Sequence, residues 1–245
     1  MLTKAQIKLI GSLTQKKQRI KQQCFVVEGV KGIREFLNSD FELDSLYGLS
    51  NTFGVPELQF TTVSSAELKK ISGLTTPNQA LAVFKMPKPL SINEQGLIVA
   101  LDDVRDPGNL GTIIRLCDWY GVKELVCSHN TVDCFNQKVV QATMGSLTRV
   151  NINYVDLEEF LKHTELTTFG TFMDGDNVYT QSLPSSAVIV MGNEANGISD
   201  AIAGIVNSRL SIPRFGALQA TESLNVAMAT SILLSEFKRG DFIEK

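Results

Sequence analysis

The pattern of hydrophobic and polar residues differs before and after residue 85 of the chain. In the first part, short apolar stretches alternate with helical repeats, such as the one that places Ile33, Phe36 and Leu37 on one side of a helix. These patterns predict helices over residues 7–19, 30–37 and 64–71, and strands over 24–27, 44–49, 58–63 and 80–84. Together they predict a small α/β domain.

A proline-containing segment, Lys85-Met-Pro-Lys-Pro89, separates this part from the rest, because prolines cannot continue a helix or a central strand. Beyond it, Leu97–Leu101 is almost continuously apolar, which is typical of a strand covered on both faces in a parallel sheet. The later pattern predicts strands over 97–101, 125–127, 150–152, 168–173, 187–191 and 209–212, and helices over 107–120, 137–143, 157–163 and 223–238. This alternation predicts a doubly wound parallel sheet.

The composition is that of a globular protein. The chain has 245 residues, of which 43% are hydrophobic and 20% charged, and its mean hydropathy is +0.04. These values exclude a disordered, collagen-like or coiled-coil chain. No apolar run approaches the roughly 18 residues that span a membrane, and the polar N-terminus lacks the apolar core of a signal peptide. We therefore expect a cytoplasmic protein that does not bind membranes.

Cysteines and histidines are too few and too scattered for several kinds of chemistry. They are Cys24, Cys117, Cys127, Cys134, His129 and His163. None shows the C-x-x-C spacing of a zinc site or redox pair, and a Ser-His-Asp or Cys-His enzyme would have little to work with. We expect no metal, and we expect any catalysis to depend on a cofactor and on positioning.

Charge is distributed unevenly along the chain. The net charge is −3, but residues 1–38 carry eight basic and two acidic side chains, and the remaining 207 residues have a net charge of −9. A localised basic surface suits phosphate binding, because Lys and Arg displace counterions from a nucleic-acid backbone. A solvated basic helix face would show the same pattern, so charge alone leaves both interpretations open.

Three segments that follow predicted strands contain more Gly, Asn and charge than a structural loop needs. In the first, residues 102–115, Asn109 lies near a helix N-terminus, Arg115 lies almost two turns later, and Arg105 is a candidate phosphate contact. A Pro-Gly turn into an amphipathic helix would also explain this segment. Ligands of open α/β sheets bind at the carboxyl ends of strands, which is where these segments are expected.

The second segment, residues 190–198, contains Gly192 and Gly197, which permit close backbone approach to a ligand, and Glu194 between them. Its spacing differs from the dinucleotide motif G-x-G-x-x-G. In the third segment, residues 212–236, Ser223 resembles a helix N-cap, and the helix does not need Asn225. A glycine-rich turn and a polar exposed residue are the structural alternatives.

Taken in order, the three segments resemble the SpoU family of RNA ribose 2′-O-methyltransferases, within the SPOUT class. The matching motifs are Asn109-x-Gly111-x-x-x-Arg115, Gly192-Asn-Glu194-x-x-Gly197 and Ser223-Leu-Asn-Val226, and the resemblance covers about residues 97–238. More weakly, Gln18-Arg19, Cys24–Gly29 and Thr76–Gln79 resemble the L30e-like RNA-binding domain that often precedes the catalytic domain.

The resemblance implies an L30e-like RNA substrate-binding domain over residues 1–85, a linker over 86–95 and a SPOUT methyltransferase domain with a trefoil knot over 96–245. It implies a homodimer, S-adenosyl-L-methionine as cofactor, and methyl transfer to a ribose 2′-hydroxyl of structured RNA, ribosomal or transfer. The implied cofactor-binding residues are Gly192, Ile212, Leu224 and Gly197. The implied catalytic residues are Asn109, Arg115, Glu194, Ser223 and Asn225, and the expected RNA-binding residues are Lys16, Lys17, Arg19, Lys21 and Arg105.

The family assigns Arg115 as the base, but a free guanidinium stays protonated at working pH. We hypothesise that Arg115 orients the ribose or its phosphate and stabilises the forming alkoxide. The loop over residues 214–222 is about three residues longer than is usual in the family, and the turn at Thr143–Ser146 is expected to be structural. A non-catalytic RNA-binding or ribosome-assembly factor on the same scaffold is the main alternative. A Rossmann-type, nucleotide-dependent enzyme is a third alternative, but this sequence lacks the glycine motif that such an enzyme needs.

Overall fold

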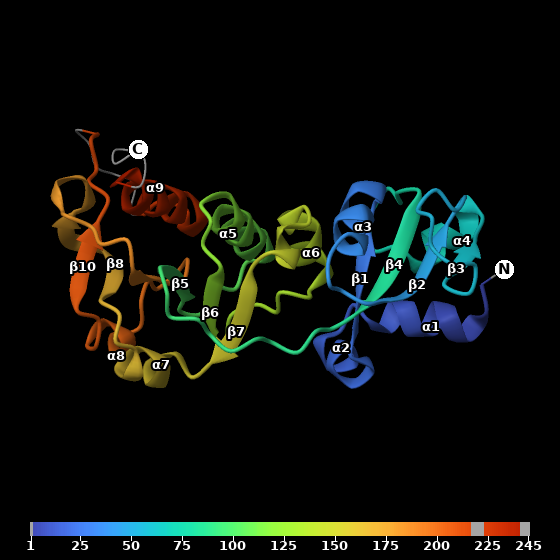
Figure 1. The fold of residues 1–245 in the computed structure, drawn as a ribbon, viewed down its shortest axis with the longest axis horizontal. Coiled ribbons are helices and arrows are strands. Elements are labelled where there is room, and N and C mark those ends of the chain that lie inside the picture. Colours follow the sequence, from blue (N-terminus) through green and yellow to red (C-terminus); the bar gives the residue numbers. More distant parts are fainter. Residues whose placement is uncertain (1, 217–222, 241–245) are drawn as a thin grey trace. The chain divides into compact units, whose positions relative to one another are not determined.

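The computed structural model describes residues 2–216 and 223–240 (Figure 1). The chain forms two compact units. The first comprises residues 1–88 and 133–148, and the second comprises 89–132 and 149–245. Each unit has its own sheet and its own core.

The first unit is built on a four-stranded mixed sheet with strand order β1-β4-β2-β3. Strand β4 is antiparallel to both β1 and β2, whereas β3 is parallel to β2. The elements are α1 (Lys4–Ser12), α2 (Lys16–Gln22), β1 (Cys24–Glu28), α3 (Val30–Leu37), β2 (Leu43–Gly48), β3 (Phe60–Thr62), α4 (Ser65–Ile71), β4 (Ala80–Lys85), α6 (Gln137–Thr143) and the short 3-10 helix η1 (Ser146–Thr148). The predicted α/β character of this region is confirmed.

Both faces of this sheet carry a core. On one face, aliphatic side chains such as Ile10, Leu68 and Leu81 form a buried cluster with α1 and α4. Elsewhere in the unit, phenylalanine rings pack together, and Phe25 of β1 lies 4.7 Å from Phe135, centroid to centroid. Because Phe135 belongs to the segment 133–148, this contact holds that segment in the first unit.

A buried ion pair makes a second attachment of the same segment. The Nη2 atom of Arg19 lies 2.5 Å from Oδ2 of Asp133, and Nη1 donates to the carbonyls of Leu13 (2.8 Å) and Thr14 (2.9 Å). These two carbonyls turn toward the guanidinium, so the predicted single helix over 7–19 is wrong: α1 ends at Ser12 and α2 begins at Lys16. The predicted second domain, residues 96–245, includes residues 133–148, but these residues pack in the first unit.

The second unit contains a six-stranded, entirely parallel sheet with strand order β10-β8-β9-β5-β6-β7. Helices α5 and α9 cover one face, and α7 and α8 lie on the other (Figure 1), so the predicted doubly wound sheet is confirmed. The elements are β5 (Leu97–Leu101), α5 (Pro107–Trp119), β6 (Glu124–Ser128), β7 (Asn151–Val155), α7 (Leu157–His163), β8 (Thr168–Asn177), η2 (Val178–Thr180), β9 (Ala187–Met191), α8 (Asp200–Ala203), β10 (Ser208–Ser211) and α9 (Val226–Arg239). The trefoil knot stays a prediction.

The two central strands position the site. Every residue of β5 and β9 is buried, as expected for strands covered on both faces. They are parallel neighbours in register, with Leu101 opposite Met191 at their carboxyl ends. The loops that follow them therefore emerge side by side. No helix among the described residues is long and apolar enough to cross a membrane.

Candidate active site

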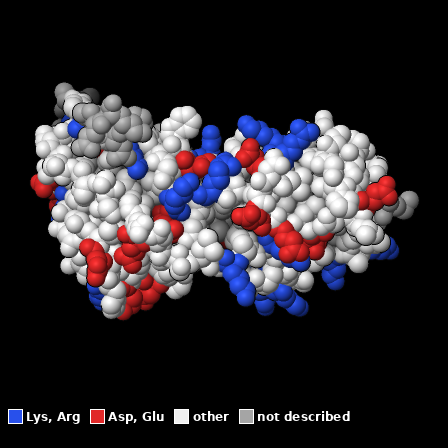
Figure 2. All heavy atoms as spheres, in the orientation of Figure 1, with Lys and Arg blue, Asp and Glu red and all other residues white. Residues whose placement is uncertain are grey.

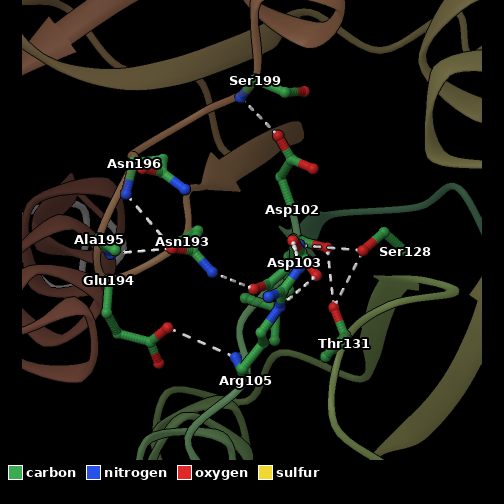
Figure 3. Close-up of polar contacts among 11 residues, drawn as sticks. Asp102, Asp103, Arg105, Ser128, Thr131, Asn193, Glu194, Ala195, Asn196 and Ser199 are labelled. Carbon is green, nitrogen blue, oxygen red and sulfur yellow. Dashed lines mark hydrogen bonds and ion pairs between the residues drawn. The ribbon is translucent and has the colours of Figure 1, made fainter.

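Two loops, residues 102–106 after β5 and 192–199 after β9, are joined by hydrogen bonds (Figure 3). The amide of Asn193 donates to the carbonyl of Asp103 at 2.6 Å, and the backbone N–H of Ser199 donates to Oδ2 of Asp102 at 2.7 Å. Asp103 has a φ of 62°, which is uncommon for a residue with a side chain, and its N–H donates to the hydroxyl of Ser128 at 2.9 Å. These bonds fix the two loops relative to each other.

The loop after β9 closes on itself at Gly192. Asn193 and Gly197 exchange backbone hydrogen bonds of 2.8 and 2.9 Å, and Gly197 has a φ of 69°. A Cβ atom at Gly192 would overlap the backbone of Gly197 and Ile198. This closure explains why the motif needs glycine at 192, since any side chain would push the loop open.

Residues from all three motifs meet in one line of hydrogen bonds. Oδ1 of Asn225 accepts from the N–H groups of Ala227 and Met228, so its amide nitrogen is free to donate to Oδ1 of Asn109 at 2.8 Å. Nδ2 of Asn109 then donates to Glu194 at 2.9 Å. Helix capping at Asn225 thus sets the orientation of both amides and aims a donor at the carboxylate.

Glu194 is held as a carboxylate. Its partial withdrawal from water alone would raise its pKa, but hydrogen bonds from Asn109 and from the backbone N–H groups of Arg105 and Asp106 lower the pKa below its ordinary value. These donors stabilise the charged form. The side chain therefore stays ionised at neutral pH and can accept hydrogen bonds from a ligand.

A cavity of about 1100 Å³ opens beside this network. The residues predicted to hold the cofactor, Gly192, Gly197, Ile212 and Leu224, all line it, as do Glu194 and Ser223. Its walls are largely apolar, and the loop after β9 contributes backbone polar groups. A cavity of this size and polarity suits a nucleoside-sized ligand.

The side chains of three expected residues lie apart from this network. Arg115 is exposed on α5, and no described residue forms a hydrogen bond or ion pair with its side chain. Arg105 is exposed and forms a bidentate pair with Asp103, at 2.6 and 3.1 Å (Figure 3). Ser223 is also exposed, and the prediction that it caps the last helix is wrong, because Asn225 is the N-cap.

The basic residues of α2 divide into two groups. Lys16, Lys17 and Lys21 are exposed, and Figure 2 shows basic side chains gathered over α2. Arg19 is 2% exposed, and its guanidinium pairs with Asp133 and donates hydrogen bonds to the carbonyls of Leu13 and Thr14. The expectation that Arg19 contacts RNA is therefore corrected: its guanidinium faces inward and attaches residues 133–148 to the unit.

The sequence motifs contained further residues whose roles were missed. Asp102 and Asn193 join the two loops through hydrogen bonds. Their positions, in the segment 102–115 and between Gly192 and Glu194, could have identified them from the sequence. Tyr179 and Phe215 line the cavity with ring centroids 6.3 Å apart, and no local motif marks them.

Residues 217–222 of the lengthened loop lie outside the described part of the chain. Among the described residues, no group of three or more His, Cys, Asp or Glu side chains could hold a metal ion.

The second unit has a parallel sheet with a ligand cavity at the carboxyl ends of its strands, beside the closed loop and the hydrogen bonds to Glu194. This arrangement is that of an α/β enzyme that binds a cofactor. The chain belongs to the SpoU rRNA methylase family, whose model matches residues 96–235. A second model, of the MRM3-like substrate binding domain, matches residues 4–82. The three motifs that carry the site all fall within the first match.

Known proteins resemble nearly the whole chain. The 23S rRNA (guanosine(2553)-2′-O)-methyltransferase RlmP of Bacillus subtilis is 31% identical over 89% of this chain and 90% of its own. A Porphyromonas gingivalis structure assigned to the TrmH family of RNA methyltransferases is 36% identical, with a TM-score of 0.90 over 98% of this chain and 99% of that one. The AdoMet-bound rRNA methyltransferase from Sinorhizobium meliloti is 30% identical, with a TM-score of 0.84 over 98% and 96%. S-adenosylmethionine is accordingly the expected cofactor.

Proposed function

We propose that this protein transfers a methyl group from S-adenosylmethionine to a ribose 2′-hydroxyl of ribosomal RNA. The observation that carries the proposal is the line of hydrogen bonds from Asn225 through Asn109 to Glu194, at a cavity lined by the loop after Gly192. A loop that only turned the chain would need neither the ordered amides nor the ionised carboxylate.

The cavity fits the cofactor. Gly192 brings the loop backbone close enough to offer its polar groups, and apolar walls from Ile212 and Leu224 suit an adenosine. The cofactor supplies a sulfonium-activated methyl group, so the protein must chiefly hold the 2′-oxygen in line with it. Glu194 is placed to accept hydrogen bonds from a ligand hydroxyl or amine, and Asn109 keeps it oriented.

Arg115 has a separate role in the proposal. Its exposed guanidinium orients the target ribose or the adjacent phosphate and stabilises the alkoxide, while the proton leaves to solvent or phosphate. Arg115→Lys should therefore lose most turnover, because Lys lacks the planar fork. Near-normal turnover of that variant would overturn this role, and a single-turnover assay measures it.

Ribosomal RNA is the substrate class we propose. The family model is that of rRNA methylases, and the Bacillus subtilis relative that matches nearly the whole chain is named for 23S rRNA. The first unit, with exposed Lys16, Lys17 and Lys21, would supply RNA recognition. We therefore also propose that the enzyme acts in the cytoplasm.

We also propose a homodimer formed through α5 and α9, which pack against each other. Trp119 at the end of α5 is 83% exposed, and Met228 on α9 is 62% exposed. Large apolar side chains that are exposed on adjacent helices favour association. Light scattering of the wild type and of Trp119→Lys tests this, and a wild-type monomer would contradict it.

The first experiment is methyl transfer from labelled S-adenosylmethionine to unmodified ribosomal and transfer RNA pools, with Arg115→Ala as control. Label in ribosomal RNA at one alkali-resistant linkage, absent with the variant, would establish ribose methylation. Label only in transfer RNA would correct the substrate class. If neither label nor cofactor binding by calorimetry is observed, the protein is instead the RNA-binding scaffold considered above.

A further inference from the structure

A second cleft, of about 440 Å³, lies entirely within the first unit. It is bordered by the turn from β1 into α3, the loop before β4 and the C-terminal end of α6. The last of these borders comes from residues more than one hundred positions away in sequence. The model of the substrate binding domain ends at residue 82, so it does not include that wall.

We propose that this cleft receives one unstacked nucleotide of the RNA substrate. The proposal rests on the proposed function, since it assumes that the substrate is RNA. Lys31 would pair with the phosphate, and the amides of Asn78 and Gln141 would bond the edge of the base.

Two glycines bring the walls of the cleft together. Gly29 has a φ of 91°, and a Cβ atom there would lie 3.1 Å from the amide nitrogen of Asn78. Gly145 has a φ of 97°, and a Cβ atom there would lie 2.6 Å from Cβ and Cγ of Glu35 on α3. The turn at 143–146 is therefore structural, as expected, and in addition it closes one side of a cleft.

The lining of the cleft suits a nucleobase. Val27, Phe36 and Val140 are almost fully buried and give it an apolar floor. Met144 stands at the rim with 45% of its surface exposed and a φ of 53°, so a large, polarisable side chain is held toward solvent. A planar base needs an apolar surface for its face and amides for its edge, and the cleft has both.

The acidic side chain in the lining does not compete for the phosphate. Glu28 is 5% exposed, and its carboxylate accepts hydrogen bonds from the hydroxyl of Ser72 (2.5 Å), the N–H of Gly73 (2.9 Å) and the amide of Gln137. It is engaged inside the unit. In contrast, Lys31, Asn78 and Gln141 are exposed at the cleft, and no described residue forms a hydrogen bond or ion pair with their side chains.

Charge favours a polyanion over a neutral or acidic partner. The first unit carries 13 basic and 8 acidic side chains, a net charge of +5, whereas the second carries 10 basic and 18 acidic ones, a net charge of −8. Figure 2 shows basic side chains over α3, the helix that begins at the cleft. The cleft accommodates one nucleotide and is too small for a duplex, so an unpaired position of the RNA is its ligand.

The test uses the full chain and labelled, unmodified 23S rRNA in a filter-binding assay. Lys31→Ala/Asn78→Ala removes the cation and one amide, and Gln141→Trp fills the cleft from an exposed helical position. We expect each to weaken RNA binding about tenfold or more, and the double variant to reduce the salt dependence by about one charge. Lys69→Ala, at an exposed lysine of α4, is the matched control and should bind like the wild type.

Cofactor affinity by calorimetry and the thermal midpoint should stay unchanged in all variants, which separates loss of the cleft from misfolding. If the wild type methylates RNA but neither cleft variant weakens binding, the cleft proposal fails and the proposed function stands. If Lys31→Ala/Asn78→Ala weakens binding but Gln141→Trp does not, Lys31 contacts a phosphate at the surface, no nucleotide enters the cleft, and the cleft proposal fails. If the wild type itself neither binds nor methylates ribosomal RNA, both proposals fail.

Discussion

The two units of this protein use glycine turns in similar ways but carry opposite charge. In each, a glycine at the end of a strand permits a close approach to the backbone: Asn78 of a distant segment approaches Gly29, and Gly197 and Ile198 of the same loop approach Gly192. The first unit has a net charge of +5 and places a lysine and amides at its cleft, whereas the second has a net charge of −8 and places a carboxylate at its cavity. Attraction of a polyanion thus belongs to the first unit, and alignment of a reacting group belongs to the second.

The units also differ in what holds their distant segments. Residues 133–148 join the first unit through side chains, namely the Arg19–Asp133 pair and the contact of Phe135 with Phe25. The second unit holds its loops through backbone closure at Gly192 and the pairing of β5 with β9, to which the side chains of Asn193 and Asp102 add hydrogen bonds. Side-chain attachments can be removed singly without changing a sheet. The comparison therefore predicts different consequences for single substitutions in the two units.

The largest expected effect is in the first unit. Asp133→Ala leaves the nearly buried guanidinium of Arg19 without its carboxylate, and we expect the unfolding free energy of this unit to fall by about 3–5 kcal/mol. Urea denaturation measured with a probe in the first unit checks this. Lys85→Ala, which breaks an exposed ion pair with Glu42, is the matched control and should cause no measurable change.

The double variant Arg19→Leu/Asp133→Leu sharpens this result, because removal of both charges avoids an unpaired buried ion. It should be less destabilised than Asp133→Ala, although the carbonyls of Leu13 and Thr14 lose their donor. Equal stability of Asp133→Ala and the wild type would mean that residues 133–148 are held chiefly by the phenylalanine contacts.

Gly192→Ala is the corresponding change in the second unit. Its Cβ atom would overlap backbone rather than a movable side chain, so the loop must open and misplace the cofactor. We expect turnover to fall about 100-fold or more, since a displacement of about 1 Å has that effect. Gly204→Ala is the control, because its Cβ atom would make ordinary contacts of 3.5 Å. Unchanged cofactor affinity and turnover in Gly192→Ala would contradict the role of loop closure.

Asn225 allows its two roles to be separated. Asn225→Ala removes the helix cap, costing about 1 kcal/mol of stability, and also removes the hydrogen bond to Asn109. Asn225→Ser restores a capping oxygen but is too short to reach Asn109. We expect the serine variant to recover stability while turnover stays reduced about tenfold, the upper range for one lost hydrogen bond. Recovery of turnover together with stability would show that Asn225 acts only as a cap.

The sequence predicts much of this architecture because its signals are local. The uninterrupted apolar run at Leu97–Leu101 and the Asp-Pro pair at 106–107 specify a buried strand and a helix start without help from distant residues. The break between α1 and α2 was missed because its cause is not local: Arg19 draws the carbonyls of Leu13 and Thr14 toward itself while paired with Asp133. No pattern within residues 7–19 reveals a partner at 133.

The same distinction applies to the site. The motifs identify Asn109, Glu194 and Asn225, but only the fold shows that Asn225 caps α9 and directs the amide of Asn109 to the carboxylate. A charge count marks Arg19 and Lys17 alike as basic, although the first is buried and the second is exposed. Burial depends on tertiary packing, so composition cannot separate a phosphate contact from an internal ion pair.

The smallest expected effect concerns the pH at which the network in the second unit breaks. Because the folded-state pKa of Glu194 lies below the ordinary 4.5, the carboxylate contributes stability that is fully present above that value and is lost as the pH falls through the folded-state pKa. Asn109→Ala removes a donor to the carboxylate, so the pKa of Glu194 should rise and the loss should begin at higher pH. A carboxyl chemical-shift titration measures both. Asn196→Ala, at an exposed neighbouring position, should titrate like the wild type, and an unchanged Glu194 titration in Asn109→Ala would show that the backbone donors alone hold the charge.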